Sequence, residues 1–184
     1  GYADRENQIP VQGKEKYHIY SCSKLFTCVA AMQLWEKGLF SLEDDLADYL
    51  PAFREMTVKT ETGIEKAKNP IKIHHLFEMT AGLNYNLQPP ALQAYYEACD
   101  RRCPTVELVN EIAKTPLEFE PGTGWRYSLC HDVLAAAVEV ISGKKFRDYV
   151  KENIFEPLEM KDSYYHNDDI LDKVAEMYVY ANSA

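Results

Sequence analysis

The sequence lacks an apolar run long enough to cross a membrane, for which roughly 18 consecutive residues are needed, and it lacks a charged and apolar leader. It is also short of positive charge, because its 20 lysines and arginines are outnumbered by 29 acidic residues, for a net charge of −9. Nucleic-acid affinity comes mainly from neutralised phosphates, so this balance argues against a nucleic-acid partner. Strand signals are few, chiefly over residues 16–20, and no internal repeat or low-complexity tract is present.

Cysteine is scarce and odd in number. The five cysteines are scattered through apolar or mixed segments: Cys22, Cys28, Cys99, Cys103 and Cys130. This pattern does not predict a disulfide framework, and it favours a reducing compartment such as the cytoplasm. Residue 1 is glycine rather than methionine, so we expect a trimmed N-terminus, and the missing leader then says little about export.

What is present is the composition of a globular body, with 46% hydrophobic and 27% charged residues. Residues 23–37 are apolar nearly all round and stop at Gly38, which predicts a buried helix. A short helix should follow Ser41 and end before Pro51, and residues 56–69 read as a loop or small hairpin. Further helices are predicted over 71–80, 91–101, 105–114, 131–142 and 146–155.

Ser21 and Lys24 stand three residues apart where the apolar helix begins. Positions i and i+3 share one helix face, so the Lys24 amine can reach the Ser21 hydroxyl. The positive end of the helix favours an alkoxide and later an oxyanion. We expect burial to lower the pKa of Lys24, so that its amine acts as a base. Tyr127 could carry protons between serine, lysine and a leaving group.

The Ser-x-x-Lys spacing is weak evidence alone, because about one chance match is expected in a chain of this size. A second match, Ser142 to Lys145, lies where a helical run ends at Gly143, the unfavourable end for an oxyanion. The helix position of each match therefore favours Ser21 over Ser142 as the candidate nucleophile. A plain helix N-cap remains the alternative reading of Ser21.

Other residue groups allow further hypotheses. A metal could bind His74, His75 and Glu78, but the spacing is not His-Glu-x-x-His, and a structural segment is the favoured reading. Trp125 and Tyr85 could line a substrate groove or simply pack. A four-ligand zinc site could be written from cysteines and a histidine, although zinc knuckles use shorter paired spacings: Cys99, Cys103, Cys130 and His131.

Four segments together resemble, in order and spacing, the serine beta-lactamase family, and more closely its class C, D-alanyl-D-alanine carboxypeptidase and family VIII esterase branch. The resemblance implies that Ser21 is acylated, that Lys24 is its base and that Tyr127 assists proton transfer. It implies no metal and no cofactor. The segments are residues 21–51, Ile73 to Leu83, Pro116 to Ser128, and Asn153 to Asp162.

Two departures from the family pattern matter. The motif reads Tyr127-Ser128-Leu129, with leucine where class C enzymes have asparagine, which favours the esterase branch. The third family motif, Lys-Thr-Gly or His-x-Gly on a strand that supplies half of the oxyanion hole, has no counterpart up to Ala184. We therefore expect an α+β, beta-lactamase-like fold, here mostly its helical portion, as one partial domain. Residues 1–40 and 128–184 would belong to its α/β region and 41–127 to its helical region.

The function expected from this resemblance is a serine hydrolase that forms an acyl-enzyme on a small-molecule ester or amide. The alternative is a non-catalytic binding module or an inactive truncated relative. Without the missing sheet, helices 23–37 and 131–142 should expose apolar faces, and patches above a few hundred Å² are rarely left bare. A second polypeptide, another copy of the chain or a rearranged packing would then cover them.

Overall fold

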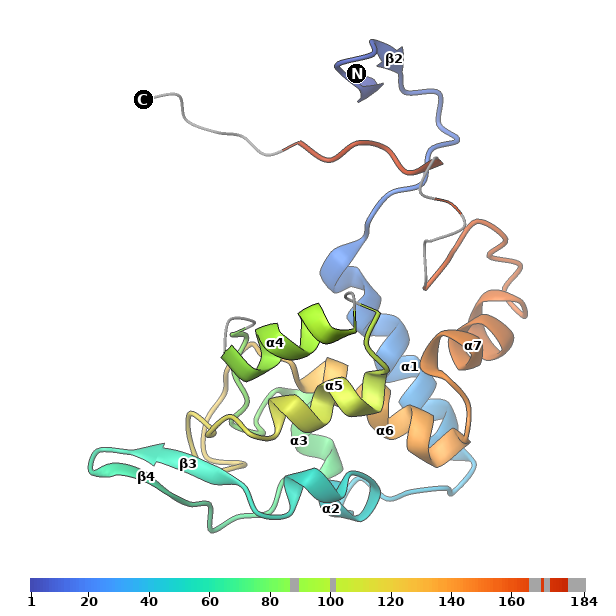
Figure 1. The fold of residues 1–184 in the computed structure, drawn as a ribbon. Coiled ribbons are helices and arrows are strands. Elements are labelled where there is room, and N and C mark those ends of the chain that lie inside the picture. Colours follow the sequence, from blue (N-terminus) through green and yellow to red (C-terminus); the bar gives the residue numbers. More distant parts are fainter. Residues whose placement is uncertain (87–89, 100–101, 166–169, 171–172, 179–184) are drawn as a thin grey trace, which may run out of the picture.

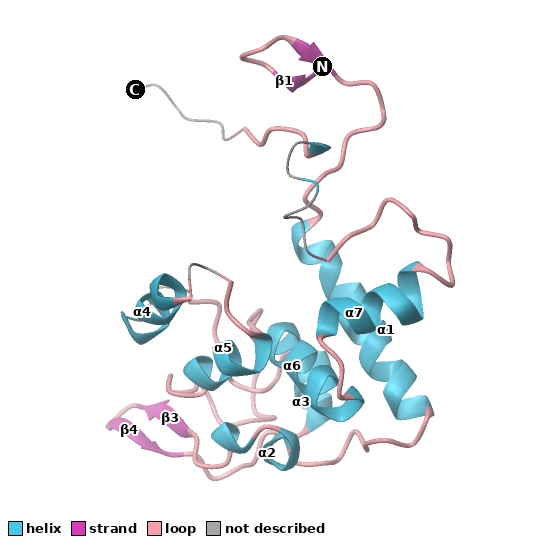
Figure 2. Ribbon diagram, turned by 45° about the vertical axis from the view of Figure 1, so that its right-hand side comes forward, coloured by secondary structure: helices cyan, strands magenta, loops and turns pink. Residues whose placement is uncertain are grey.

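The computed structural model describes residues 1–86, 90–99, 102–165, 170 and 173–178, and it contains a helical body from which two extended segments project (Figures 1 and 2). The helices of the body are α1 (Ser23–Glu36), α2 (Leu46–Tyr49), α3 (Ile73–Glu78), α4 (Pro90–Ala98), α5 (Thr105–Ile112), α6 (Cys130–Ser142) and α7 (Phe146–Val150). Two short 3-10 helices, Tyr20–Cys22 and Pro51–Phe53, precede α1 and follow α2, and a π-helical turn, Lys151–Phe155, continues α7.

The strands form two separate antiparallel pairs. β1 (Tyr2–Asp4) pairs with β2 (Ile9–Pro10) in the projecting N-terminal segment. β3 (Thr57–Thr60) pairs with β4 (Gly63–Lys66) in a hairpin that extends from the body near α2 (Figure 2). The hairpin confirms the interpretation of residues 56–69, with its turn at Glu61 and Thr62.

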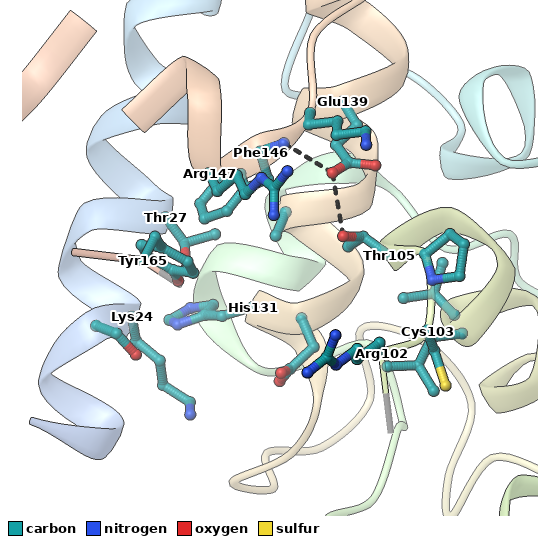
Figure 3. Close-up of a pocket in the computed structure, with 17 residues that line it drawn as sticks. Lys24, Thr27, Arg102, Cys103, Thr105, His131, Glu139, Phe146, Arg147 and Tyr165 are labelled. Atoms are coloured by element: carbon teal, nitrogen blue, oxygen red, sulfur yellow. Dashed lines mark hydrogen bonds between the residues drawn. The ribbon is translucent and has the colours of Figure 1, made fainter. Parts of the chain in front are cut away.

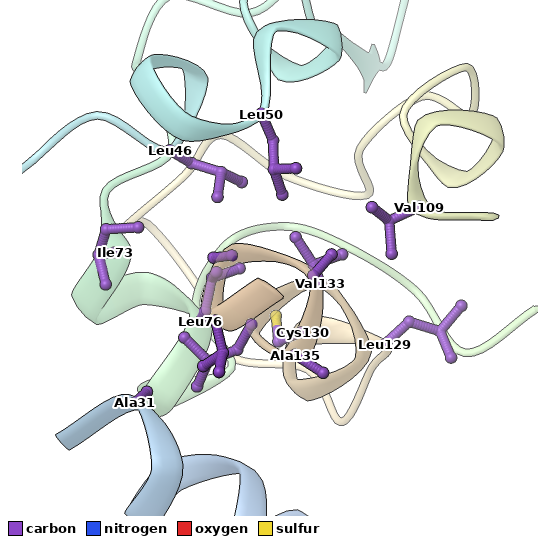
Figure 4. Close-up of a cluster of buried hydrophobic side chains, with 14 of the residues drawn as sticks. Ala31, Leu46, Leu50, Ile73, Leu76, Val109, Leu129, Cys130, Val133 and Ala135 are labelled. Carbon is purple, nitrogen blue, oxygen red and sulfur yellow. The ribbon is translucent and has the colours of Figure 1, made fainter. Parts of the chain in front are cut away.

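Helix α6 occupies the centre of the helical body. It contacts α1, α3, α5 and α7, and the consecutive residues Val133 to Val138 are all buried. Side chains from α2, α3 and α5 converge on it, as Figure 4 shows for Leu46, Leu76 and Val109. A helix that is apolar all round is stable only when surrounded, and this arrangement surrounds it.

The prediction that helix 131–142 exposes an apolar face is therefore wrong, apart from exposed Val140. The corresponding prediction for helix 23–37 is confirmed. Ala30, Ala31 and Leu34 of α1 face the body and are buried, whereas an apolar stripe remains exposed on the same helix: Leu25, Val29 and Trp35.

The helix positions predicted from the sequence are confirmed within a few residues, except that residues 100 and 101 of the predicted helix 91–101 lie outside the described part. The predicted strand over residues 16–20 is wrong. Lys16 alone forms an isolated bridge there, with Val174, and Tyr20 already begins the 3-10 turn before α1. In this segment the backbone has a pairing partner for about one residue only, too few for a ladder.

The N-terminal segment and residues 173–178 run together away from the helical body (Figure 1). The Lys16 N–H donates to the Lys173 carbonyl at 3.0 Å, and the Ala175 N–H donates to the Lys16 carbonyl at 2.9 Å. Lys16 also pairs with Asp162 at 2.6 Å. Within the described residues, no helix combines the length and apolarity that a membrane span requires.

We predict that Gly82→Ala destabilises the protein by about 2–5 kcal/mol, from left-handed strain plus a steric clash. Gly82 has φ +81°, and a Cβ there would lie 2.3 Å from the Phe119 carbonyl oxygen. Gly143→Ala is the matched control, because Gly143 has φ +69° and no atom within 4 Å of such a Cβ. It should cost only about 1–2 kcal/mol. Equal losses in urea unfolding would show that the close contact with Phe119 does not matter.

Candidate active site

Ser21 lies in the 3-10 turn that leads directly into α1. The turn is closed by a hydrogen bond from the Cys22 N–H to the Ile19 carbonyl at 3.0 Å. Tyr20, just before the serine, has φ +45°, a left-handed conformation that is unfavourable for a tyrosine. The turn presents the exposed Ser21 side chain at the N-terminal end of α1, as the sequence predicts.

Tyr127 comes from the irregular segment before α6, and backbone hydrogen bonds fix that segment on both sides of it. The Arg126 N–H donates to the Met79 carbonyl and the Leu129 N–H donates to the Asn84 carbonyl, both at 3.1 Å. Both acceptors belong to the segment that follows α3. Tyr127 is thus held between α3 and α6 by main-chain contacts rather than by a regular element.

The structure brings Ser21, Lys24 and Tyr127 together. The Ser21 Oγ and the Tyr127 hydroxyl oxygen are 2.6 Å apart, within hydrogen-bonding distance. The Lys24 Nζ lies 5.2 Å from the centre of the Tyr127 ring. Tyr127 is therefore a neighbour of both Ser21 and Lys24.

The expected lowering of the Lys24 pKa is wrong. Burial does lower the pKa of Lys24, but the hydrogen bond to Tyr127 and the negative charge of Asp132 outweigh it, so the pKa is raised. Sequence alone reveals the apolar helix that desolvates the amine, but it does not reveal the partners that stabilise its charge. Lys24 is a cation in this arrangement.

The pKa of Tyr127 is lowered from its ordinary value. The hydrogen bond with Ser21 contributes most, followed by the neighbouring Lys24 ammonium. Each of these stabilises a phenolate. Tyr127 is thus deprotonated more readily than an ordinary tyrosine, and its phenolate oxygen would lie within reach of the serine proton.

Asp132 and His131 act electrostatically on Lys24 or are acted on by it; from sequence, Asp132 had no assigned role and His131 only a place in the zinc hypothesis. Asp132 is in the first turn of α6, where it is exposed at the border of a cavity. Desolvation by the surrounding protein raises its pKa, and the Lys24 charge offsets part of that rise. His131 places its Nε2 3.4 Å from the Phe77 carbonyl oxygen and 3.6 Å from the Cys28 Sγ. Burial lowers the pKa of His131. The sequence feature that could have placed Asp132 and His131 near the site was their position in the first turn of a predicted helix just after Tyr127.

A cavity of about 760 Å³ lies between α1, α5, α6 and α7. Figure 3 shows Lys24 from α1 and His131 from α6 reaching it from neighbouring positions, with Arg102 and Glu139 further along. Glu139 accepts hydrogen bonds from the Thr105 hydroxyl at 3.0 Å and from the Phe146 N–H at 2.7 Å. Of the three predicted site residues, Lys24 lines this cavity.

The other residue groups have structural contacts. The His75 Nδ1 accepts the Lys72 N–H at 3.0 Å, and His74 lies 3.4 Å from Glu78. In the described part of the chain, no group of three or more histidine, cysteine or acidic residues is arranged to hold a metal. Ser142 is the last residue of α6, at the helix end that disfavours an oxyanion.

Cys99 and Cys103 form a disulfide that the sequence did not predict. Their Cα atoms are 5.3 Å apart, because the turn between α4 and α5 brings them together. The remaining cysteines are unpaired: Cys22, Cys28 and Cys130. The odd number of cysteines had argued against disulfides, but one local pair is present. This disulfide removes two of the four ligands from the zinc hypothesis.

The family model for beta-lactamase matches residues 1–183. The chain belongs to the beta-lactamase family. Esterase EstB from Burkholderia gladioli is 33% identical over 168 residues, which cover 88% of this chain and 41% of that esterase. This match and the fold confirm the resemblance seen in the sequence.

Solved structures give the same fold. EstCE1, a hydrolase with promiscuous acyltransferase activity, matches with a TM-score of 0.77 at 30% identity, over 95% of this chain and 46% of that one. A penicillin-binding protein from Bacillus halodurans matches with a TM-score of 0.71 at 28% identity, over 95% of this chain and 52% of that one. The chain thus spans about half the length, or less, of these relatives.

We predict that Ser21→Ala and Lys24→Met each raise the pKa of Tyr127, because each removes a group that stabilises the phenolate. The measurement is a pH titration of 13Cζ-labelled tyrosine by NMR, with Tyr127→Phe assigning the signal. Lys144→Met is the control, since Lys144 pairs with Glu152 instead. A Tyr127 pKa unchanged in Lys24→Met would contradict the geometry.

Proposed function

We propose that the chain carries the nucleophile and proton-transfer groups of a serine hydrolase that acts through an acyl-enzyme on small esters or amides. The observation that carries this proposal is the 2.6 Å contact between the Ser21 Oγ and the Tyr127 hydroxyl, with the Lys24 Nζ 5.2 Å from the centre of the Tyr127 ring. Esterase EstB, a relative at 33% identity, supports the reaction class.

In the acylation step, the Ser21 Oγ attacks the carbonyl carbon of the substrate while its proton passes to the Tyr127 phenolate. The tetrahedral intermediate then collapses, the bond to the leaving oxygen or nitrogen breaks, and Tyr127 returns the proton to that atom. Acyl-Ser21 and a free alcohol or amine result. Lys24 remains positively charged and stabilises the phenolate whenever Tyr127 is deprotonated.

Hydrolysis of the acyl-enzyme follows the same route with water. Tyr127 takes a proton from water as the water oxygen attacks the acyl carbon, and it then protonates the departing Ser21 Oγ. The Ser21 N–H at the start of α1 supplies one oxyanion donor. In the family a second donor comes from the Lys-Thr-Gly or His-x-Gly strand, which residues 1–184 do not contain.

The substrate preference proposed is for activated esters over cephalosporins. Leu129 occupies the position where class C enzymes have asparagine, and it is buried. A buried leucine cannot hydrogen-bond the amide group of a cephalosporin substrate. A simple ester carries no such amide group and loses nothing by the absence of a polar side chain at residue 129.

We further propose that the exposed stripe of α1, which consists of Leu25, Val29 and Trp35, is covered in the functional protein by a second polypeptide or by another copy of the chain. These three large apolar side chains of one helix are 67%, 39% and 42% exposed, and contiguous exposed apolar surface often marks an interaction site.

A fluorophosphonate probe tests the nucleophile in the full-length gene product. We predict labelling of Ser21, its loss in Ser21→Ala, and a slowing of acylation by about 10²–10⁴ in Lys24→Ala, because the proton-transfer group Tyr127 then loses the charge that stabilises its phenolate. Ser142→Ala is the matched control, because Ser142 belongs to the second Ser-x-x-Lys match, and it should label normally. Labelling that survives Ser21→Ala would refute the assignment, and no labelling of a folded protein would favour a non-catalytic binding module.

A comparison of substrates tests the preference. We predict a higher kcat/KM for p-nitrophenyl acetate or butyrate than for nitrocefin, because Leu129 cannot hydrogen-bond a substrate amide. Leu129→Asn should narrow the gap if this side chain is responsible. A higher efficiency on nitrocefin in the unaltered protein would reverse the proposal.

A further inference from the structure

Tyr85 lies beside the site without contributing to the proton transfers proposed above. It follows α3 in a loop whose neighbouring residue, Asn84, accepts the Leu129 N–H at 3.1 Å and donates its side-chain amide to Glu118 at 3.3 Å. The backbone beside Tyr85 is thus tied to the segment that carries Tyr127.

The Tyr85 ring faces the Lys24 ammonium. The Lys24 Nζ lies 5.5 Å from the centre of the Tyr85 ring and 5.2 Å from that of Tyr127. The two rings are in contact with each other, with centres 5.3 Å apart and planes inclined at 44°. A cation within about 6 Å of a ring centre is attracted by its π-electrons. Both aromatic rings therefore attract the same ammonium.

A competing attraction acts on Lys24 from the opposite element. Asp132 of α6 borders the cavity that Lys24 also lines, and its negative charge attracts the ammonium. The neighbouring His131 adds no attraction, because burial and the Lys24 charge both lower its pKa and so favour its neutral form. A long lysine side chain has several rotamers of similar energy. With Asp132 alone as its partner, the ammonium could turn into the cavity and away from the Tyr127 hydroxyl. The Tyr85 ring favours the rotamer that keeps it there.

We propose that Tyr85 is a positioning residue of this site, whose ring holds the Lys24 ammonium against Tyr127 by a cation–π contact. This inference rests on the proposed function. The ring rather than the hydroxyl of Tyr85 performs the role, because the close approach of Lys24 is to the ring. The expected consequence is kinetic: without the ring, the ammonium stabilises the Tyr127 phenolate less often.

Three variants of the full-length gene product test the inference by ester hydrolysis across pH. Tyr85→Leu removes the ring, and we expect kcat to fall by about 5–30-fold, the effect of losing a cation–π contact of ordinary strength. Its ascending pH limb should move to higher pH, because Tyr127 loses part of the charge that lowers its pKa. Tyr85→Phe should recover most of the rate and the original limb. Tyr164→Leu is the matched control. Tyr164 is 48% exposed and Tyr85 is 47% exposed, but Tyr164 does not border the cavity that Lys24 lines.

The outcomes separate this inference from the proposed function. Equal losses in Tyr85→Phe and Tyr85→Leu would assign the role to the hydroxyl and overturn the inference. A lower rate in Tyr85→Leu with an unmoved pH limb would mean loss of packing only, and it would overturn the inference too. Circular dichroism and thermal melting establish that each variant is folded. If Ser21→Ala keeps its activity, the proposed function itself fails, whatever Tyr85 does.

Discussion

The packing of α1 against α6 is the contact on which the site depends. Ser21 and Lys24 stand at the start of α1, and Tyr127 lies three residues before α6, so the distance between serine and tyrosine is set by how the two helices meet. Buried alanines on both helices, such as Ala31 and Ala136, leave room for a close approach. Because α6 is also packed against α3, α5 and α7, most of the body fixes its position.

The electrostatics of the site follow from that packing. Lys24 has the phenol of Tyr127 and the carboxylate of Asp132 as neighbours. Together they raise the pKa of Lys24 by more than desolvation lowers it. Its retained charge is in turn part of what lowers the pKa of Tyr127. A lysine that keeps its own proton thus makes the phenolate of a neighbouring tyrosine easier to form, so the protonation states of the two residues depend on their surroundings and not only on their residue types.

Much of the helical pattern could be predicted from the sequence, because glycines and prolines mark the helix ends and the apolar run of residues 23–37 is long. The three site residues could be selected because their spacing has a helical meaning and their segments match a family. The remainder depended on tertiary contacts. The sequence of residues 131–142 does not indicate how many helices surround them. The sequence around Lys24 does not indicate its interaction with Asp132, which is distant along the chain and acts on Lys24 in the fold.

The position of Ser21 at the junction between the N-terminal segment and α1 has a consequence for the order in which the molecule is built. Lys16, which lies before the Tyr20–Cys22 turn, is anchored by Asp162, which lies 146 residues further along the chain. On the ribosome, Ser21 emerges well before Asp162. The segment that precedes Ser21 therefore lacks this anchor until Asp162 has been added to the chain.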